Sequence, residues 1–173
     1  MVERFRSAAP TPACHHFAMF ETLRDLFDGL LPPSPDSDPQ AAERALQLAA
    51  AVMLVEVMRA DPGLHPAARE AARNALREEF MLSAVEATCL VELADATAKE
   101  STDLFSFTSR INDRFEMPQK LRMIEHMWRV AYADGTLSAY ERHIMWRIAD
   151  LLHVPQGAYV NARMRAAQQA GAA

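Results

Sequence analysis

A few places in this sequence carry residues that could bind a metal ion. Asp61 and His65 flank a Pro-Gly turn, and an imidazole beside a carboxylate suits Zn²⁺, Ni²⁺ or Cu²⁺ better than Ca²⁺. His65 also precedes Pro66 at the start of a predicted helix, so the alternative role for His65 is an N-cap. Residues 14–16 (Cys-His-His) place three potential ligands side by side near the N-terminus, an arrangement typical of adventitious metal binding.

Motifs of the common enzyme classes are absent from the sequence. There is no Gly-rich phosphate loop, no His-Glu-x-x-His and no Gly-x-Ser-x-Gly. Acidic residues adjoin histidines at positions 125–126 and 141–143, but neighbours on a helix point to different faces. The sequence therefore predicts a protein that is not an enzyme.

A second acidic segment begins with the turn signal Asp134-Gly135. Ser138 and Glu141 follow with the spacing of a capping box, in which the serine and the glutamate satisfy each other's backbone amides at a helix start. Leu137 between them is predicted to fill the core. This structural role accounts for the spacing without any ligand.

The elements that hold these residues are predicted to be helices throughout. Apolar residues recur every three or four positions, and no segment has the strict alternation of a strand. Pro, Gly and capping patterns divide the chain into helices at about 17–31, 39–60, 66–80 and 84–100, a fifth capped by Ser101 or Thr102, a sixth starting near Pro118, a seventh capped by Ser138, and an eighth that carries Tyr159, Val160 and Met164. The fold class is all-α, a compact single-domain bundle of about seven to eight helices.

The domain organisation follows from a proline-rich interruption. We expect a disordered N-terminal extension (1–16), an amphipathic helix (17–31), a Pro-rich linker (32–38), a helical domain (39–168) and a flexible tail (169–173). The helix at 17–31 could dock on the bundle, pair with a partner or lie on a membrane. The membrane is disfavoured because Arg24 is the segment's only basic residue.

Composition excludes several function classes. The chain has 173 residues, of which 50% are hydrophobic and 24% charged, and a formal net charge of −5, so it lacks the basic footprint of a nucleic-acid-binding protein. Its longest apolar run, residues 48–55, is too short to span a membrane. These features predict a cytoplasmic protein with no transmembrane segment.

Two stretches of the sequence repeat each other at a distance of 73 residues. Val, Ala, Asp and Leu recur in register between residues 56–64 and 129–137. Each stretch reads as the end of an apolar helix, a turn begun by Asp, and a second helix. The repeat predicts two helical hairpins related by a pseudo-twofold, with the equivalent residues Glu56 and Arg129 as an ion pair.

The repeated motif resembles a known family. Ala-Asp-Gly-x-Leu-x-x-x-Glu after an apolar helix, seen in residues 54–70 and 128–152, resembles the TerB-like tellurite-resistance proteins over about residues 45–165. The resemblance implies a bundle of about seven helices, a bacterial stress-response role, no defined enzymatic activity and a divalent-cation site. By motif position that site falls on Asp61, Asp134 and Glu141. The first copy departs from the pattern, with Pro62, His65 and Ala68 in place of Gly, Asp and Glu.

Two hypotheses about function follow. The first is a non-enzymatic TerB-like protein that binds a divalent cation weakly, Ca²⁺ or Mg²⁺ through carboxylates, turn carbonyls and water, or Zn²⁺ if His65 participates. The second is a helical protein-interaction module with no metal or catalytic role. Under both hypotheses we expect an unidentified protein partner, and neither hypothesis specifies the oligomeric state.

Overall fold

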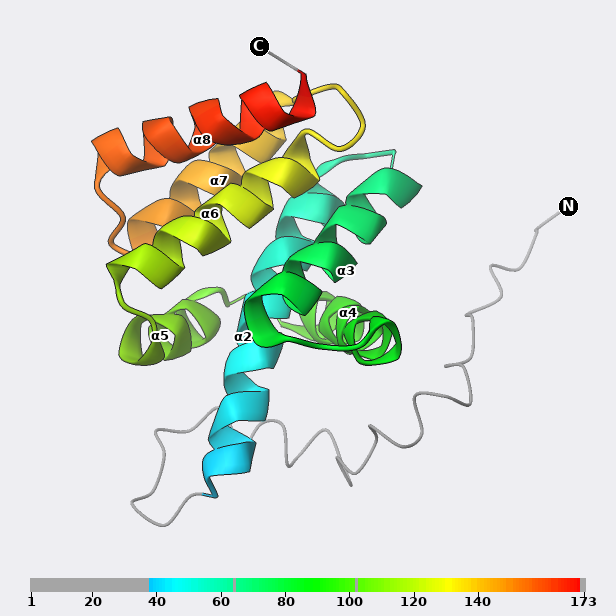
Figure 1. Ribbon diagram of the computed structural model, residues 1–173, viewed down its shortest axis with the longest axis vertical. Coiled ribbons are helices and arrows are strands. Elements are labelled where there is room, and N and C mark those ends of the chain that lie inside the picture. The colour runs from blue at the N-terminus through cyan, green and yellow to red at the C-terminus, as the bar shows by residue number, and fades with distance from the viewer. Residues whose placement is uncertain (1–37, 64, 102, 172–173) are drawn as a thin grey trace, which may run out of the picture.

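The most apolar part of the chain forms a long helix through the middle of the molecule. The protein is described by a computed structural model, which covers residues 38–63, 65–101 and 103–171 (Figure 1). Within those residues it is built from seven helices and has no strand. They are α2 (Pro39–Ala60), α3 (Pro66–Phe80), α4 (Ala84–Glu100), α5 (Phe105–Arg114), α6 (Met117–Ala131), α7 (Ala139–Leu151) and α8 (Gln156–Ala170). The all-α prediction is confirmed.

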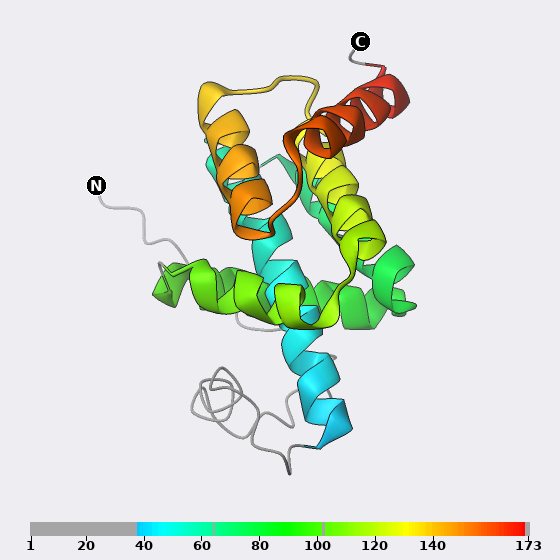
Figure 2. The same ribbon diagram turned by 90° about the vertical axis from the view of Figure 1, so that its left-hand side faces the viewer.

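Helix α2 is central because it has no polar face over most of its length. Every side chain from Leu48 to Val55 is 3% exposed or less, so that stretch must be surrounded on all sides. Helices α3, α4, α5, α6 and α7 all pack against it, and α8 packs on α6 (Figures 1 and 2). The acidic turns at residues 61 and 134 follow α2 and α6, two helices that pack against each other.

Side-chain caps define most helix starts. The Asp38 carboxylate accepts the Gln40 N–H at 3.0 Å, with Pro39 in the first turn. Capping boxes open α4, through Ser83 and Glu86, and α7, through Ser138 and Glu141. These predicted caps are confirmed.

The start of α5 differs from the prediction. Ser101 closes α4, since its N–H donates to the Thr97 carbonyl at 3.0 Å, and is therefore not available to begin the next helix. The cap position of α5 is Leu104, and the Asp103 carboxylate accepts the Phe105 N–H at 2.9 Å. The other predicted cap, Thr102, lies outside the described residues.

The predicted ion pair between Glu56 and Arg129 is wrong. Glu56 pairs with Arg59 on its own helix at 3.2 Å. Arg129 instead contacts Glu78 on α3 at 3.3 Å and donates to Gln169 on α8 at 2.9 Å. The partners of Arg129 thus come from α3 and α8, which pack on α6.

Several predicted segments fall outside the described residues, namely the extension (1–16), the amphipathic helix (17–31) and all of the linker except Asp38. At the other end, α8 runs to Ala170, so the first two residues of the predicted flexible tail are helical. No helix in the described part of the chain is both long enough and apolar enough to cross a membrane.

Candidate functional site

The two acidic turns share one hydrogen-bond pattern. Asp61 ends α2, and its Oδ1 accepts the Gly63 N–H at 2.9 Å. Asp134 follows α6, and its Oδ1 accepts the Thr136 N–H at 2.9 Å, while its Oδ2 accepts the Thr136 hydroxyl at 3.0 Å. In each turn the carboxylate fixes the backbone two residues on, as short acidic side chains do. The hydrogen bonds occur at equivalent positions, 73 residues apart.

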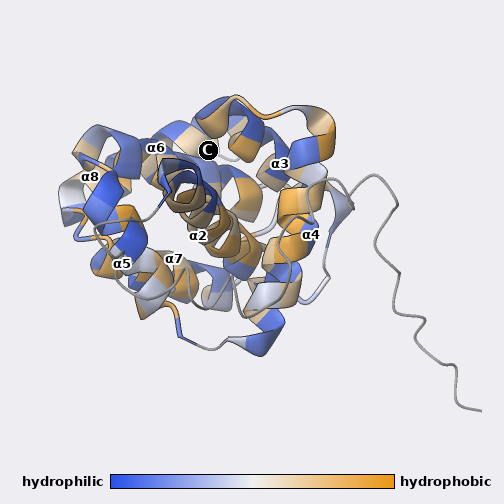
Figure 3. Cartoon of the chain, turned by 90° about the horizontal axis from the view of Figure 1, so that it is seen from below, coloured by the Kyte–Doolittle hydropathy of each residue, from blue (hydrophilic) through white to orange (hydrophobic). Residues whose placement is uncertain are grey.

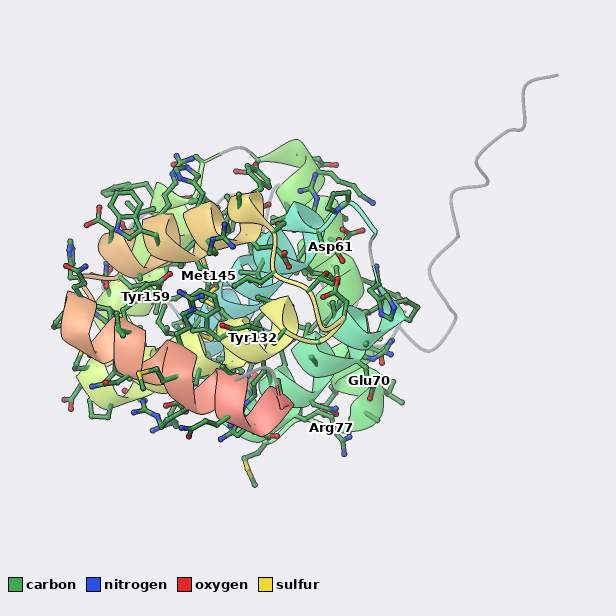
Figure 4. All side chains as sticks on the ribbon, turned by 90° about the horizontal axis from the view of Figure 1, so that it is seen from above. Asp61, Glu70, Arg77, Tyr132, Met145 and Tyr159 are labelled. Carbon is green, nitrogen blue, oxygen red and sulfur yellow. The ribbon has the colours of Figure 1, made fainter. Side chains whose placement is uncertain are left out.

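The packing of α2 against α6 brings these two carboxylates together. Asp61 and His65 both lie close enough to Asp134 to lower the pKa of its carboxyl group. Figure 4 shows Asp61 at the end of the bundle, beside the loop that joins α6 to α7. Neither carboxylate has an ion pair with Lys or Arg among the described residues.

The charge state of Asp134 follows from these contacts. Partial burial raises the pKa of Asp134, but the hydrogen bonds from Thr136, the contact with Asp61 and the attraction of His65 together outweigh burial, so the pKa lies below its ordinary value. Asp134 is therefore ionised at neutral pH, next to a second carboxyl group. Such a pair attracts a cation.

His65 caps α3, as the alternative role predicted. The side chain is exposed, and its Nδ1 accepts the Ala67 N–H at 3.3 Å. With Nδ1 occupied, only Nε2 remains for a metal ion or a proton.

Glu141 occupies its capping box. Its side chain is buried, its Oε2 accepts the Ser138 N–H at 2.7 Å, and its own N–H donates to Ser138 Oγ at 3.1 Å. The predicted set of three carboxylates is not grouped: among the described residues no three His, Cys, Asp or Glu side chains lie together as metal ligands. Residues 14–16 lie outside the described part of the chain.

A second cluster of titratable groups lies between α3 and α6, and the sequence analysis did not predict it. His126 is 6% exposed, with Nε2 at 3.8 Å from a Glu79 oxygen and Nδ1 at 4.0 Å from a Glu78 oxygen. Arg122 binds Glu79 through two hydrogen bonds of 3.0 and 3.2 Å, and Arg129 contacts Glu78. The sequence places Glu125 next to His126, but only the packing of α3 on α6 brings the glutamates of α3 to the imidazole.

An aromatic cluster joins α6 to α8. Trp128 is fully buried, with the rings of Tyr132 and Tyr159 at 5.7 and 5.5 Å from its own. The Arg163 guanidinium lies over the indole at 5.3 Å and donates to the Tyr132 hydroxyl at 3.1 Å. Figure 4 shows both tyrosines between α7 and α8.

The fold and the site define a class of protein: an all-α bundle in which two equivalent acidic turns meet at one end. The family model of tellurite resistance protein TerB matches residues 47–164. The chain therefore belongs to the TerB family. No curated protein and no solved structure matches it significantly.

Proposed function

We propose that this TerB-family protein is not an enzyme and that its Asp61–Asp134 pair binds a divalent cation weakly. The observation that supports the proposal is the proximity of two carboxyl groups from separate turns, close enough for one to change the pKa of the other, without a Lys or Arg ion pair among the described residues. A tellurite-resistance or stress-response role in the cytoplasm of a bacterium is part of the same proposal.

The chemistry of the pair favours a hard cation held loosely. Carboxylate oxygens suit Ca²⁺ and Mg²⁺, which take six or more oxygen ligands, and water must supply most of them here. The proposed affinity is therefore low. Zn²⁺, which accepts an imidazole nitrogen, is the second ion to test because His65 acts electrostatically on Asp134.

The proposal is tested by titrating Ca²⁺, Mg²⁺ and Zn²⁺ into the protein while recording amide chemical shifts and thermal melts. We expect millimolar Ca²⁺ or Mg²⁺ to shift the amides of Asp61, Gly63 and Thr136 and to raise the melting temperature slightly. Asp134→Asn keeps an oxygen for the turn but removes a charge, and should abolish both responses.

Asp103→Asn is the matched control, because Asp103 also accepts a backbone N–H two residues on but lies at the start of α5. It should leave the ion response intact. Equal responses in wild type and Asp134→Asn, or none in wild type up to about 10 mM ion, would refute the proposal.

A second candidate function, a protein-interaction module, is favoured by one face of α7. Tyr140 is 60% exposed and Trp146 is 56% exposed, with His143 beside Trp146. Exposed aromatic residues of this kind are enriched at protein interfaces. If this face binds a partner, Trp146→Ala should lose a complex co-purified from the native cells, while Asp134→Asn should retain it.

A further inference from the structure

The aromatic cluster where α8 meets α6 is rich in hydrogen-bond donors. Trp128 and Tyr132 come from α6 and its C-cap, and Tyr159 and Arg163 come from α8. Helix α8 lies at the edge of the molecule beside α6 (Figure 3), and the two tyrosines lie between α7 and α8 in the view from above (Figure 4). The rings of both tyrosines pack against the same indole, at 5.7 and 5.5 Å.

The Arg163 guanidinium is held in place by two of these neighbours. It lies over the Trp128 ring at 5.3 Å, and its Nε donates to the Tyr132 hydroxyl at 3.1 Å. Trp128 is fully buried and Tyr132 is only 9% exposed, so the guanidinium rests on groups that packing fixes. The two contacts engage the face of the guanidinium and its Nε, which leaves the N–H groups of both terminal nitrogens for another partner.

No carboxylate neutralises this arginine in the described part of the chain. Arg163 takes part in none of the ion pairs formed there, whereas Arg165, two residues on, pairs with Glu125 of α6. The Tyr132 hydroxyl accepts from Arg163 and still has its own proton to donate. The cluster therefore combines a positive charge with donors for which the described residues supply no acceptor.

Tyr159 adds a further donor next to these groups. Burial raises the pKa of Tyr159, the positive charge of Arg163 opposes this only in part, and Tyr132 adds to the increase. The Tyr159 phenol therefore keeps its proton at neutral pH and can donate it in a hydrogen bond. Its electrostatic interactions with Arg163 and Tyr132 show that the three polar groups lie near one another.

We propose that Arg163, Tyr132 and Tyr159 form a binding site for a small oxyanion of the phosphate type. A planar guanidinium can donate to two oxygens of such an anion at once, and its positive charge strengthens both hydrogen bonds. Donors from three side chains suit an anion with three or four oxygens better than a carboxylate with two. This inference is independent of the proposed cation site, whose carboxyl groups attract the opposite charge.

A titration of the full-length protein with inorganic phosphate tests the site. The ionic strength is kept constant with sodium chloride while the Arg163 Nε–H signal and the amides of residues 159–163 are recorded by NMR. We expect saturable shifts with a dissociation constant of about 1–10 mM. Acetate, which has fewer oxygens, should bind more weakly in the same titration.

Three variants separate the site from general charge effects. Arg163→Lys keeps the charge but loses the planar pair of donors, and should weaken phosphate binding at least about tenfold. Tyr159→Phe removes one hydroxyl while the ring remains, and should weaken it by about two- to tenfold. Arg77→Lys is the matched control, because Arg77 is an exposed arginine on α3, apart from both tyrosines (Figure 4). It should bind phosphate like the wild type, and thermal melts without phosphate verify that each variant is folded.

Three results would overturn the inference. The wild type could show no saturable shift up to about 50 mM phosphate. Arg163→Lys and Tyr159→Phe, both folded, could bind phosphate as tightly as the wild type. Acetate could bind as tightly as phosphate, which would exclude a site selective for a phosphate-type anion.

Discussion

At the scale of single residues, the structure separates groups that look alike in the sequence. Asp134 and Glu141 both belong to the second acidic motif, yet Asp134 meets another carboxyl group while Glu141 is buried within its capping box. Asp134 lies in the turn after α6, whereas Glu141 lies in the first turn of α7, where its carboxylate accepts the Ser138 N–H that has no helical acceptor. The role of Glu141 is thus structural in this arrangement.

Substitutions in the capping box should show this role. Ser138→Ala removes the acceptor of the Glu141 N–H and should lower the free energy of unfolding by about 0.5–2 kcal/mol. Glu141→Gln should change it less, because a Gln side chain can still accept the Ser138 N–H. Denaturant unfolding in EDTA measures both. Ser83→Ala, in the equivalent box of α4, should match Ser138→Ala. A larger loss for Glu141→Gln than for Ser138→Ala would argue against the capping role.

His126 gives the protein a pH-dependent stability. Burial lowers the pKa of His126 below its ordinary 6.5, and Arg129 lowers it further; Glu78, Glu79 and Glu125 raise it without restoring the ordinary value. The folded protein therefore binds this proton less readily than the unfolded chain does. The contribution of His126 to stability is complete above pH 6.5 and is lost as the pH falls toward the folded-state pKa.

We therefore expect the free energy of unfolding to drop as the pH falls below about 6.5, and the drop to be smaller in His126→Gln. Urea unfolding at a series of pH values measures this difference. His143→Gln, at an exposed position on α7, is the control and should retain the wild-type slope. If His126→Gln retained it as well, the pH dependence would have to come from other groups.

At the scale of the helices, the end of α3 contains a residue poorly suited to its backbone. Met81 caps this helix with φ 55°, in the left-handed region, and its side chain is 88% exposed. An L-residue with a Cβ is strained there, whereas Gly is not. Because the Met81 side chain makes few packing contacts, its removal should cost little packing energy.

Met81→Gly should accordingly raise the free energy of unfolding by about 0.5–1 kcal/mol. Met164→Gly offers a control of opposite sign, because Met164 is also exposed but lies within α8. That substitution should lower stability by about 1 kcal/mol. Thermal or denaturant unfolding of both variants measures these changes. Destabilisation by Met81→Gly would show that Met81 is not strained in its left-handed conformation.

The helices were predictable where the sequence has explicit boundary signals. Pro39, Pro66 and the two capping boxes each mark a start that the structure confirms. The start of α5 was missed because its cap position is Leu104 and no Ser or Thr side chain caps it. Local signals determine where a helix begins only when a side chain binds its free amides.

The candidate site was predictable only as separate parts. The 73-residue repeat identifies Asp61 and Asp134 as equivalent, but their contact depends on how α2 and α6 pack. The same limit explains the wrong pairing of Glu56 with Arg129. The partners of Arg129 lie on α3 and α8, and the spacing of residues in the sequence does not show which helices are neighbours.

At the scale of the whole molecule, one aromatic residue joins the C-terminal helix to the rest. Helix α8 packs mainly on α6, and Trp128 lies at that contact with Tyr159 and Arg163 of α8 around its ring. The Trp128 indole N–H has no hydrogen-bond partner among the described residues. The contribution of Trp128 therefore comes from packing and from the Arg163 guanidinium over its ring.

Trp128→Ala should lower the free energy of unfolding by about 3–5 kcal/mol, as expected for a large buried side chain. Trp128→Phe should lose much less, since a ring remains and no hydrogen bond is broken. Trp146→Ala, on the exposed face of α7, should change stability by no more than about 0.5 kcal/mol. Denaturation followed by circular dichroism compares the three. Similar losses for the two alanine variants would contradict this account of α8.

The position of α2 at the centre has a consequence for how the protein is made. The ribosome completes α2 at Ala60, but α7, which covers part of α2, ends only at Leu151. At about 5–20 residues per second, translation takes roughly 5–20 s to cover that distance. During this interval the run Leu48–Val55 has only part of its packing partners, so the nascent chain exposes the kind of apolar surface that chaperones bind. The order of synthesis leaves the core of this protein incomplete until the last third of the chain has emerged.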